Sequence, residues 1–131
     1  MRPSAPDHKI VYVRFHKRID EKITEFSEKT GMRRATAVTW IRNRYMQELL
    51  KNGVQPESVT EKDLGFTGIE ESYFISLGRG SEGSMLGKGM QLTVDKREER
   101  TFSFIAMQCG LSSRDFLTAI LVQYFDSLGM L

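Results

Sequence analysis

The sequence predicts a mainly α-helical fold that contains one small two-stranded antiparallel β-ribbon. Three observations predict it. Residues 9–15 alternate apolar and polar side chains, as a strand with one buried face does. Two segments with helical periodicity follow, at 19–31 and 32–53. The same order, one strand and then two helices, recurs in residues 89–131.

The two faces of the first strand differ in chemistry. Val11, Val13 and Phe15 fall on one face, which we expect to be buried. Tyr12 and Arg14 fall on the opposite face, pointing away from any core. A short strand with these outward side chains raises the question of what pairs with it and what its outer face contacts.

Both helical segments of the first part carry an apolar stripe and a glycine stop. In 19–31 the stripe contains Ile19, Ile23 and Phe26, and Gly31 ends the segment. In 32–53 the segment ends at Gly53, and its stripe contains Val38, Ile41, Tyr45 and Leu49.

An internal repeat connects the two parts of the chain. Aligning Gly110 on Gly31 sets an offset of 79 residues without gaps, and the apolar phase then continues through one strand and two helices. One position breaks the match, because Ile19 aligns with Glu98. The apolar residues of the second part that align with apolar residues of the first are Met90, Leu92, Val94, Phe102, Ile105, Leu117, Ile120, Tyr124 and Leu128.

Residues 54–88 separate the two parts. They contain six glycines and more acidic than basic side chains. Thr60 with Asp63 is typical of the start of a short helix. We expect 71–78 to form a strand or an apolar strap, and 78–89 to be flexible.

Composition bounds the class of protein. The chain has 131 residues and 40% hydrophobic content, which suits one compact domain or two small units that share a core. No apolar run reaches the ~18 residues of a membrane span, and residues 1–10 lack the apolar core of a signal peptide. We therefore expect a cytoplasmic protein without a membrane partner. A single cysteine, Cys109, excludes internal disulfides and cysteine-rich metal sites.

The positive charge is concentrated in the first part of the chain. Residues 1–53 hold 12 Lys/Arg and 6 Asp/Glu, whereas 54–88 hold 3 and 6, and 89–131 hold 4 and 5. A basic unit favours polyanionic partners, although a solvated helix face has a similar count.

A single unit of this kind is near the size limit for folding alone. We expect the two strands to pair with each other inside one chain, with four helices around their shared apolar face. The predicted organisation is an N-terminal arm over 1–8, a first unit over 9–53, a linker over 54–88 and a second unit over 89–131.

The motifs in these units resemble a known family. VRFHKRIDEKITEFSEKTG followed by MRRATAV resembles the ribbon-helix-helix family of the Arc and MetJ type, and GLSSRDFL resembles the family's entry into its second helix. Two units in one chain resemble TraY-type plasmid-transfer accessory proteins. The chain departs from the pattern at His16, where the family commonly has proline, and at Arg33, where it often has a capping serine.

The resemblance implies an intramolecular pseudo-dimer whose ribbon lies in the major groove of double-stranded DNA. The base-reading candidates are Tyr12, Arg14, Gln91 and Thr93. An arginine can bind guanine through O6 and N7, and a glutamine can bind adenine through N6 and N7. The alternative is an outer face that only contacts solvent.

Phosphate contacts are expected near the start of each second helix, where free backbone N–H groups attract anions. Plain helix capping by Ser112 with Asp115 is an equal alternative there. The candidates are Arg33, Arg34, Ser112 and Ser113, with Lys9, Lys17 and Lys88 as auxiliary contacts.

Other classes of function are less well supported by the sequence. Without metal-ligand spacing, a nucleophile motif or a dinucleotide fingerprint, we expect no catalysis, cofactor or metal. The alternative is an antitoxin or interaction module whose second half binds a protein. Within DNA binding, a transcriptional repressor and a relaxosome accessory protein are both possible.

The last helical segment is apolar nearly all round, at Phe116, Ala119, Val122 and Phe125. These side chains predict a core, with a self-association patch on adjacent DNA sites as the alternative.

Overall fold

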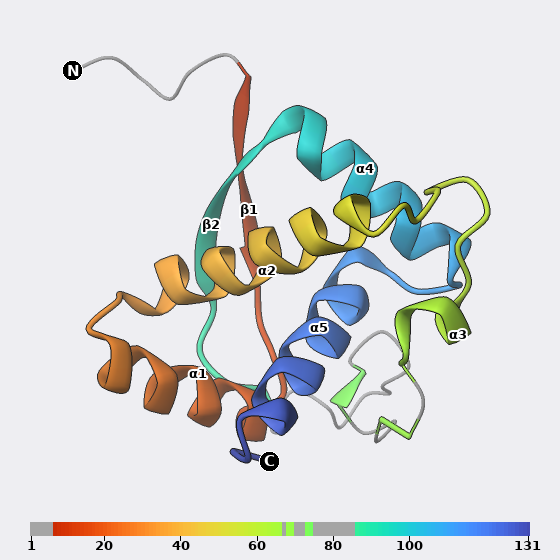
Figure 1. The fold of residues 1–131 in the computed structure, drawn as a ribbon. Helices are drawn as coiled ribbons and strands as arrows, with labels where there is room; N and C mark the ends of the chain where they lie inside the picture. The colour runs from red at the N-terminus through yellow and green to blue at the C-terminus, as the bar shows by residue number, and fades with distance from the viewer. Residues whose placement is uncertain (1–6, 67, 70–72, 75–85) are drawn as a thin grey trace.

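The structure is a computed structural model that describes residues 7–66, 68–69, 73–74 and 86–131 (Figure 1). The predicted mainly helical fold with one antiparallel ribbon is confirmed. The elements in chain order are β1 (His8–Val13), α1 (Lys17–Thr30), α2 (Arg34–Lys51), α3 (Glu61–Leu64), β2 (Met90–Asp95), α4 (Lys96–Gln108) and α5 (Ser113–Ser127).

The ribbon pairs a strand near the N-terminus with a strand in the second part of the chain. β1 and β2 are antiparallel, with Val11 opposite Leu92 and Tyr12 opposite Gln91. The predicted pairing of the two strands within one molecule is therefore confirmed. The pairing continues past β1 as a single bridge between His16 and Leu86.

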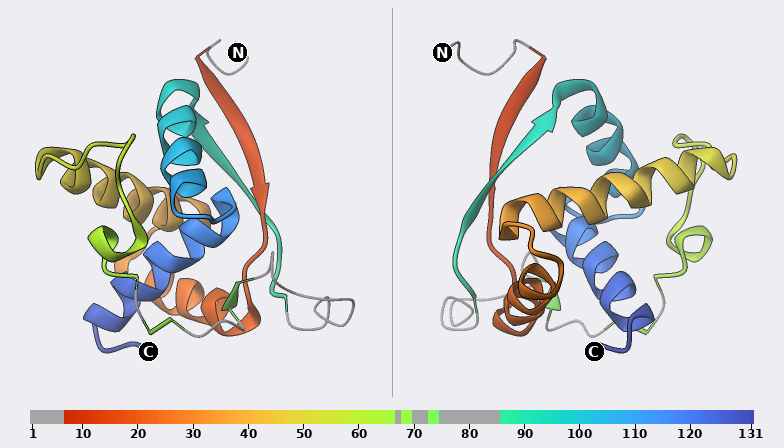
Figure 2. Two further views of the ribbon diagram at one scale, coloured as in Figure 1. Left: turned by 90° about the vertical axis from the view of Figure 1, so that its right-hand side faces the viewer. Right: turned by 60° about the vertical axis from the view of Figure 1, so that its left-hand side comes forward.

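The inner face of the ribbon joins the core, as predicted. Met90, Leu92 and Val94 are buried, and Val11 and Val13 are partly buried against the same cluster. In both views of Figure 2 the ribbon lies along one side of the molecule and the helices pack on the other side. This one-sided cover follows from the alternation of the strands, because each strand directs a continuous row of apolar side chains to the helix side.

The helices bury the stripes that their spacing predicts. α1 buries Ile19, Ile23 and Phe26, and α4 buries Phe102 and Ile105. α2 and α5 form the centre of the bundle and bury residues that include Val38, Ile41, Leu49, Leu117 and Ile120. The stripe prediction fails at Leu128, which follows α5 and is exposed, whereas its counterpart Leu49 is buried.

α5 is covered on its remaining faces by the segment that follows α2. The Phe66 ring lies 5.7 Å from the Phe116 ring, and Gln123 Nε2 donates to the carbonyl oxygen of Leu64 at 3.0 Å. The core prediction for the apolar faces of α5 is thereby confirmed. This segment contains α3, whose predicted start is also confirmed, since Thr60 and Asp63 cap it reciprocally.

The starts of the helices repeat with the predicted offset of 79 residues. α1 and α4 begin at Lys17 and Lys96, and α2 and α5 begin at Arg34 and Ser113. The glycines that set the offset, Gly31 and Gly110, both adopt the left-handed conformation, with φ of 75° and 74°. A residue with a side chain rarely adopts this φ, which explains a glycine at both turns.

Most of the predicted strap and flexible stretch lies outside the described residues. Within 71–78, Tyr73 and Phe74 are described; Tyr73 is buried, and its ring lies 5.1 Å from that of His16. In the described ranges, none of the helices has the length and hydropathy needed to cross a bilayer.

Candidate nucleic-acid interface

The outer face of the ribbon brings together three of the four predicted base-reading residues. Tyr12 is 66% exposed, and Gln91 and Thr93 are exposed beside it. Ile10 adds a second exposed apolar side chain, at 57%. This face is not covered by any helix in the views of Figure 2.

Arg14, the fourth predicted reader, lies just past the end of β1. Its Nε donates to the carbonyl oxygen of Gly87 at 3.1 Å, and the side chain is partly buried. This hydrogen bond fixes the base of the guanidinium. Within the described part of the chain, Nη1 and Nη2 of Arg14 make no hydrogen bond, and the side chain lines a hollow beside α5.

That hollow lies between β1 and the first turn of α5 and has a volume of about 390 Å³. Arg14 and Arg114 line it together with Tyr12. The buried ion pair of Arg42 with Glu99 also lines it. Ser112 and Ser113 line it where α5 begins. The backbone N–H groups of a helix start and two guanidinium groups make this hollow favourable for an anion.

A second hollow, also of about 390 Å³, lies on the other side of the ribbon between β2 and the start of α2. Gln91, Thr93 and Ala35 line it. With the offset of 79 residues, Gln91 corresponds to Tyr12 and Thr93 to Arg14 in the first hollow. Ala35 corresponds to Arg114. The two hollows thus use equivalent positions with different side chains. The first is cationic, whereas Ala35 and Thr93 leave the second without those charges.

The starts of α2 and α5 differ in their caps. Ser112 Oγ accepts a hydrogen bond from the backbone N–H of Asp115 at 3.1 Å, so the predicted capping by Ser112 is confirmed. At α2 the capping position is Arg33, whose side chain makes no capping hydrogen bond with the described residues. The first turn of α2 therefore lacks the side-chain cap that the first turn of α5 has.

Arg34 is held inside the first unit and does not extend from it. Its Nη2 donates to Oδ1 of Asp20 at 2.5 Å, and Nη1 donates to Oγ1 of Thr24 at 2.6 Å. Ser113 occupies the equivalent place in α5, and its Oγ lies 2.9 Å from that of Ser103 on α4. Both residues join the second helix of a unit to the first, and phosphate contact by either stays a prediction.

The remaining predicted phosphate contacts are exposed but scattered. Arg33, Lys17 and Lys88 are exposed near the ends of the ribbon strands or helices. Lys9 is also exposed, but it lines a groove along α4 with Lys96 and does not line either hollow.

Sequence reasoning missed Arg114, the exposed second residue of α5. Its equivalent in the first unit is Ala35, so the repeat gives no charge signal at this position. The signal that does exist is local, because Arg114 directly follows the serine pair that begins α5.

A buried ion pair lies at the floor of the first hollow. Arg42 is 2% exposed, and its Nη2 donates to Oε1 of Glu99 at 2.5 Å. The Arg42 guanidinium also stacks over the Phe102 ring, 4.1 Å from its centre. Burial lowers the pKa of the Arg42 guanidinium, and the charge of Glu99 opposes that shift. These contacts join α2 of the first unit to α4 of the second.

Among the described residues, no group of three or more His, Cys, Asp or Glu side chains is arranged to hold a metal ion. No protein-family model, curated protein or solved structure gives a significant match to this chain.

Proposed function

We propose that this chain binds double-stranded DNA sequence-specifically, by laying the outer face of its β1–β2 ribbon in the major groove. In this proposal, residues 9–53 and 89–131 are tandem ribbon-helix-helix units that form an intramolecular pseudo-dimer. The proposal rests on the pairing of β1 with β2 and on the exposed set of side chains that this pairing presents.

The observation that carries the proposal is the register of the ribbon. Tyr12 lies opposite Gln91, and these two residues are 79 positions apart, which is also the spacing of the helix starts. A residue that pairs with its own counterpart lies on a two-fold axis between two related units. The register therefore supports a pseudo-dimer whose axis passes through the middle of the ribbon.

The side chains on the exposed face support groove binding by their chemistry. The major groove admits a two-stranded ribbon, and its base edges offer hydrogen-bond partners to Arg and Gln side chains and apolar contacts to methyl groups. Gln91 and Thr93 supply the polar contacts from β2, and Tyr12 and Ile10 supply apolar surface from β1. The four side chains lie in two directly opposed pairs.

In the proposed complex, the two hollows contact phosphates, and the difference between them sets the orientation of the protein on the DNA. Each hollow lies beside the start of a helix, at equivalent places on the two sides of the ribbon. Arg14 and Arg114 concentrate positive charge in the first hollow. We therefore propose an asymmetric DNA site, bound in one orientation, with stronger backbone contacts on the α5 side.

The biological role within DNA binding follows only by analogy with tandem proteins of the family. An accessory protein of the relaxosome at a plasmid-transfer origin and a transcriptional repressor both need specific binding without catalysis. We propose the first role, with transcriptional regulation as the second.

The antitoxin alternative receives less support from the fold. A toxin-binding tail is commonly disordered before it binds. Here α5 lies at the centre of the core, and Phe116 and Phe125 are completely buried. The second half of the chain is thus an integral part of the fold.

The test is selection of bound duplexes from a random pool, with the stoichiometry of each complex measured by native mass spectrometry. We expect an asymmetric consensus within the footprint of one ribbon, bound by one ribbon from one chain. A perfect inverted repeat within that footprint would contradict the intramolecular pseudo-dimer. Recovery of no consensus, with equal affinity for random DNA, would contradict sequence-specific binding.

A further inference from the structure

The outer face of α4 exposes a pair of large apolar side chains one turn apart. Phe104 is 40% exposed and Met107 is 67% exposed, although the opposite face of α4 already buries Phe102, Ile105 and Ala106 in the core. Apolar side chains that gather on an exposed helix face often mark a contact surface.

The equivalent face of the first unit shows that the fold does not require these residues. Counting back 79 positions from Phe104 and Met107 leads to Glu25 and Glu28 on α1. Both are charged, and Glu28 is exposed on the same face of a helix that begins at the equivalent residue. These two positions are therefore acidic on α1 and apolar on α4, and Glu25 is paired with Lys22 at 3.3 Å.

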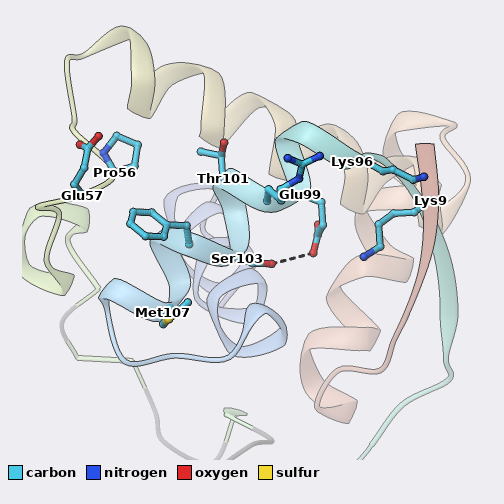
Figure 3. A pocket seen from close by; sticks show the side chains of 10 residues that line it. Lys9, Pro56, Glu57, Lys96, Glu99, Thr101, Ser103 and Met107 are labelled. Carbon is cyan, nitrogen blue, oxygen red and sulfur yellow. Dashed lines mark hydrogen bonds between the residues drawn. The ribbon is translucent and has the colours of Figure 1, made fainter. Parts of the chain in front are cut away.

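The apolar pair lies in a groove of about 870 Å³ along α4. Figure 3 shows Lys9 and Lys96 at one end of this groove and Pro56 and Glu57 at the other, with Met107 between them. Arg100, one turn before Phe104, adds a third exposed cation to the groove lining. Glu99 also lines the groove beside Lys96, and its carboxylate is paired with Arg42. The groove thus has an end with three exposed cations, an apolar middle and an acidic end.

The position of Glu57 is fixed by α4 itself. Gln108, the last residue of α4, donates from Nε2 to the backbone oxygen of Glu57. The exposed residue Glu57 therefore lies beside the C-terminal end of α4, whereas Arg100 lies in the N-terminal half of the helix.

We propose that this groove, defined by Arg100, Phe104, Met107 and Glu57, is the contact surface between two copies of this chain. The two α4 helices lie antiparallel across a two-fold axis. Under that symmetry the basic end of each groove faces the acidic end of the other, so that Arg100 meets Glu57 of the second copy. The Phe104 and Met107 side chains of both copies meet in the middle.

A two-fold contact of this kind closes after two chains. In an isologous interface each copy buries the same surface against the other, so that this surface is not free to bind a third copy. Because α1 carries Glu25 and Glu28 at the equivalent positions, the described face of α1 does not repeat the apolar pair of α4. The expected product is a discrete dimer, formed with or without DNA, and it does not depend on the proposed function.

The first experiment measures the mass of the full chain by sedimentation velocity over a range of concentrations without DNA. The wild type is expected to shift from 15.0 kDa to twice that mass. The variant Phe104→Glu/Met107→Glu, which copies the residues of α1, is expected to stay at the single-chain mass. Thermal unfolding followed by circular dichroism checks that the variant is folded. A wild type that stays single at all concentrations, or a folded variant that still pairs, would overturn the proposal.

The second experiment tests the antiparallel arrangement by exchanging charges. Arg100→Glu and Glu57→Arg should each weaken the pairing by about tenfold or more, because each places like charges opposite one another. The combined variant should recover most of the wild-type affinity. The matched control Glu21→Arg, at the position on α1 equivalent to Arg100, should leave the pairing unchanged. Failure of the combined variant to recover would overturn the antiparallel contact, and DNA binding, measured separately, bears only on the proposed function.

Discussion

Arg42 on α2 and Glu99 on α4 form a buried ion pair, 2.5 Å between Nη2 and Oε1, that ties the two halves of the chain together. The Arg42 side chain is 3% exposed and stacks on Phe102. Removal of one partner leaves the other charge buried without compensation, which usually costs more than the pair itself contributes. The stability of the fold should therefore be sensitive to Glu99.

We expect Glu99→Ala to lower the free energy of unfolding by about 3–5 kcal/mol, because it leaves the Arg42 guanidinium unpaired in the core. Urea unfolding followed by circular dichroism measures the loss. Glu98→Ala, at the exposed neighbouring position, is the control and should change stability by less than about 0.5 kcal/mol. Equal effects at the two positions would contradict a special role for the pair.

A buried phenol predicts a stability that depends on pH at the alkaline end. Burial raises the pKa of the Tyr45 phenol above its usual 10.0, and Oη has no hydrogen-bond partner among the described residues. The unfolded chain loses this proton near pH 10, whereas the folded chain retains it. The corresponding stability is complete below pH 10 and is lost as the pH rises above 10.

Tyr45→Phe should therefore be as stable as the wild type at pH 7, or more stable by up to about 1 kcal/mol, since it removes an unpaired buried hydroxyl. Above pH 10 the variant should lose less stability per pH unit than the wild type. Urea unfolding at pH 7 and at several values above 10 measures both effects. Parallel pH curves for the two proteins would show that Tyr45 does not titrate in this way.

Two glycines before β2 predict different costs for the same substitution. A Cβ atom at Gly87 would lie 2.4 Å from Cβ and Cγ of Asp20, whose carboxylate is held by Arg34. A Cβ atom at Gly89 would instead collide with the end of the Tyr12 ring, which is exposed and can rotate away. We expect Gly87→Ala to cost about 1–3 kcal/mol and Gly89→Ala less than about 1 kcal/mol.

Thermal unfolding of the two variants side by side measures this difference. The double variant Gly87→Ala/Asp20→Ala tests the collision in part, because it removes Cγ and Oδ2 of Asp20, two of the three atoms that the new Cβ would meet, and leaves the Cβ of residue 20 in place. If Gly87→Ala were as mild as Gly89→Ala, the close approach of the 87 backbone to α1 would not be rigid.

Periodicity predicted the parts of the fold whose burial alternates regularly. The strand phase placed Leu92 in the core and Val11 against it, and the helical phase placed Ile23 and Ile105 in the core. Gly31 and Gly110 set the offset because both turns need a positive φ. These features each depend on local backbone geometry, which a short stretch of sequence specifies.

The missed features depend on contacts between distant segments. Val59, Leu64 and Phe66 are buried against the bundle, but they stand singly among polar residues and give no periodic signal. Arg42 and Glu99 are 57 residues apart, and each one alone resembles a solvated helix charge.

The position of one predicted site residue, Arg34, also depends on a contact between separate helices. Arg34, expected to extend toward a phosphate, is 14 residues from Asp20 and turns back to pair with it. The sequence shows a charge at the start of a helix but not the competing carboxylate on the preceding helix. Arg34→Ala should therefore reduce the stability of the first unit, in addition to any effect on DNA.

The last prediction separates base reading from backbone contact within the first hollow. Arg14 and Arg114 both line it, but Arg14 extends from the end of the ribbon and Arg114 from the start of α5. In the proposed complex, Arg14→Ala should cost about 1–3 kcal/mol on the selected duplex and relax the preference at one base pair. Arg114→Ala should weaken selected and random duplexes alike and reduce the slope of log K against log salt by about 1.

Fluorescence anisotropy with selected and random duplexes at several salt concentrations distinguishes the two effects. Arg44→Ala is the matched control, because Arg44 is an exposed arginine on α2 that lines neither hollow. Arg44→Ala should leave affinity and salt slope close to the wild type. Equal losses on selected and random DNA for Arg14→Ala would remove its role as a reader and assign both arginines to the backbone, because a base contact must distinguish sequences whereas a phosphate contact cannot.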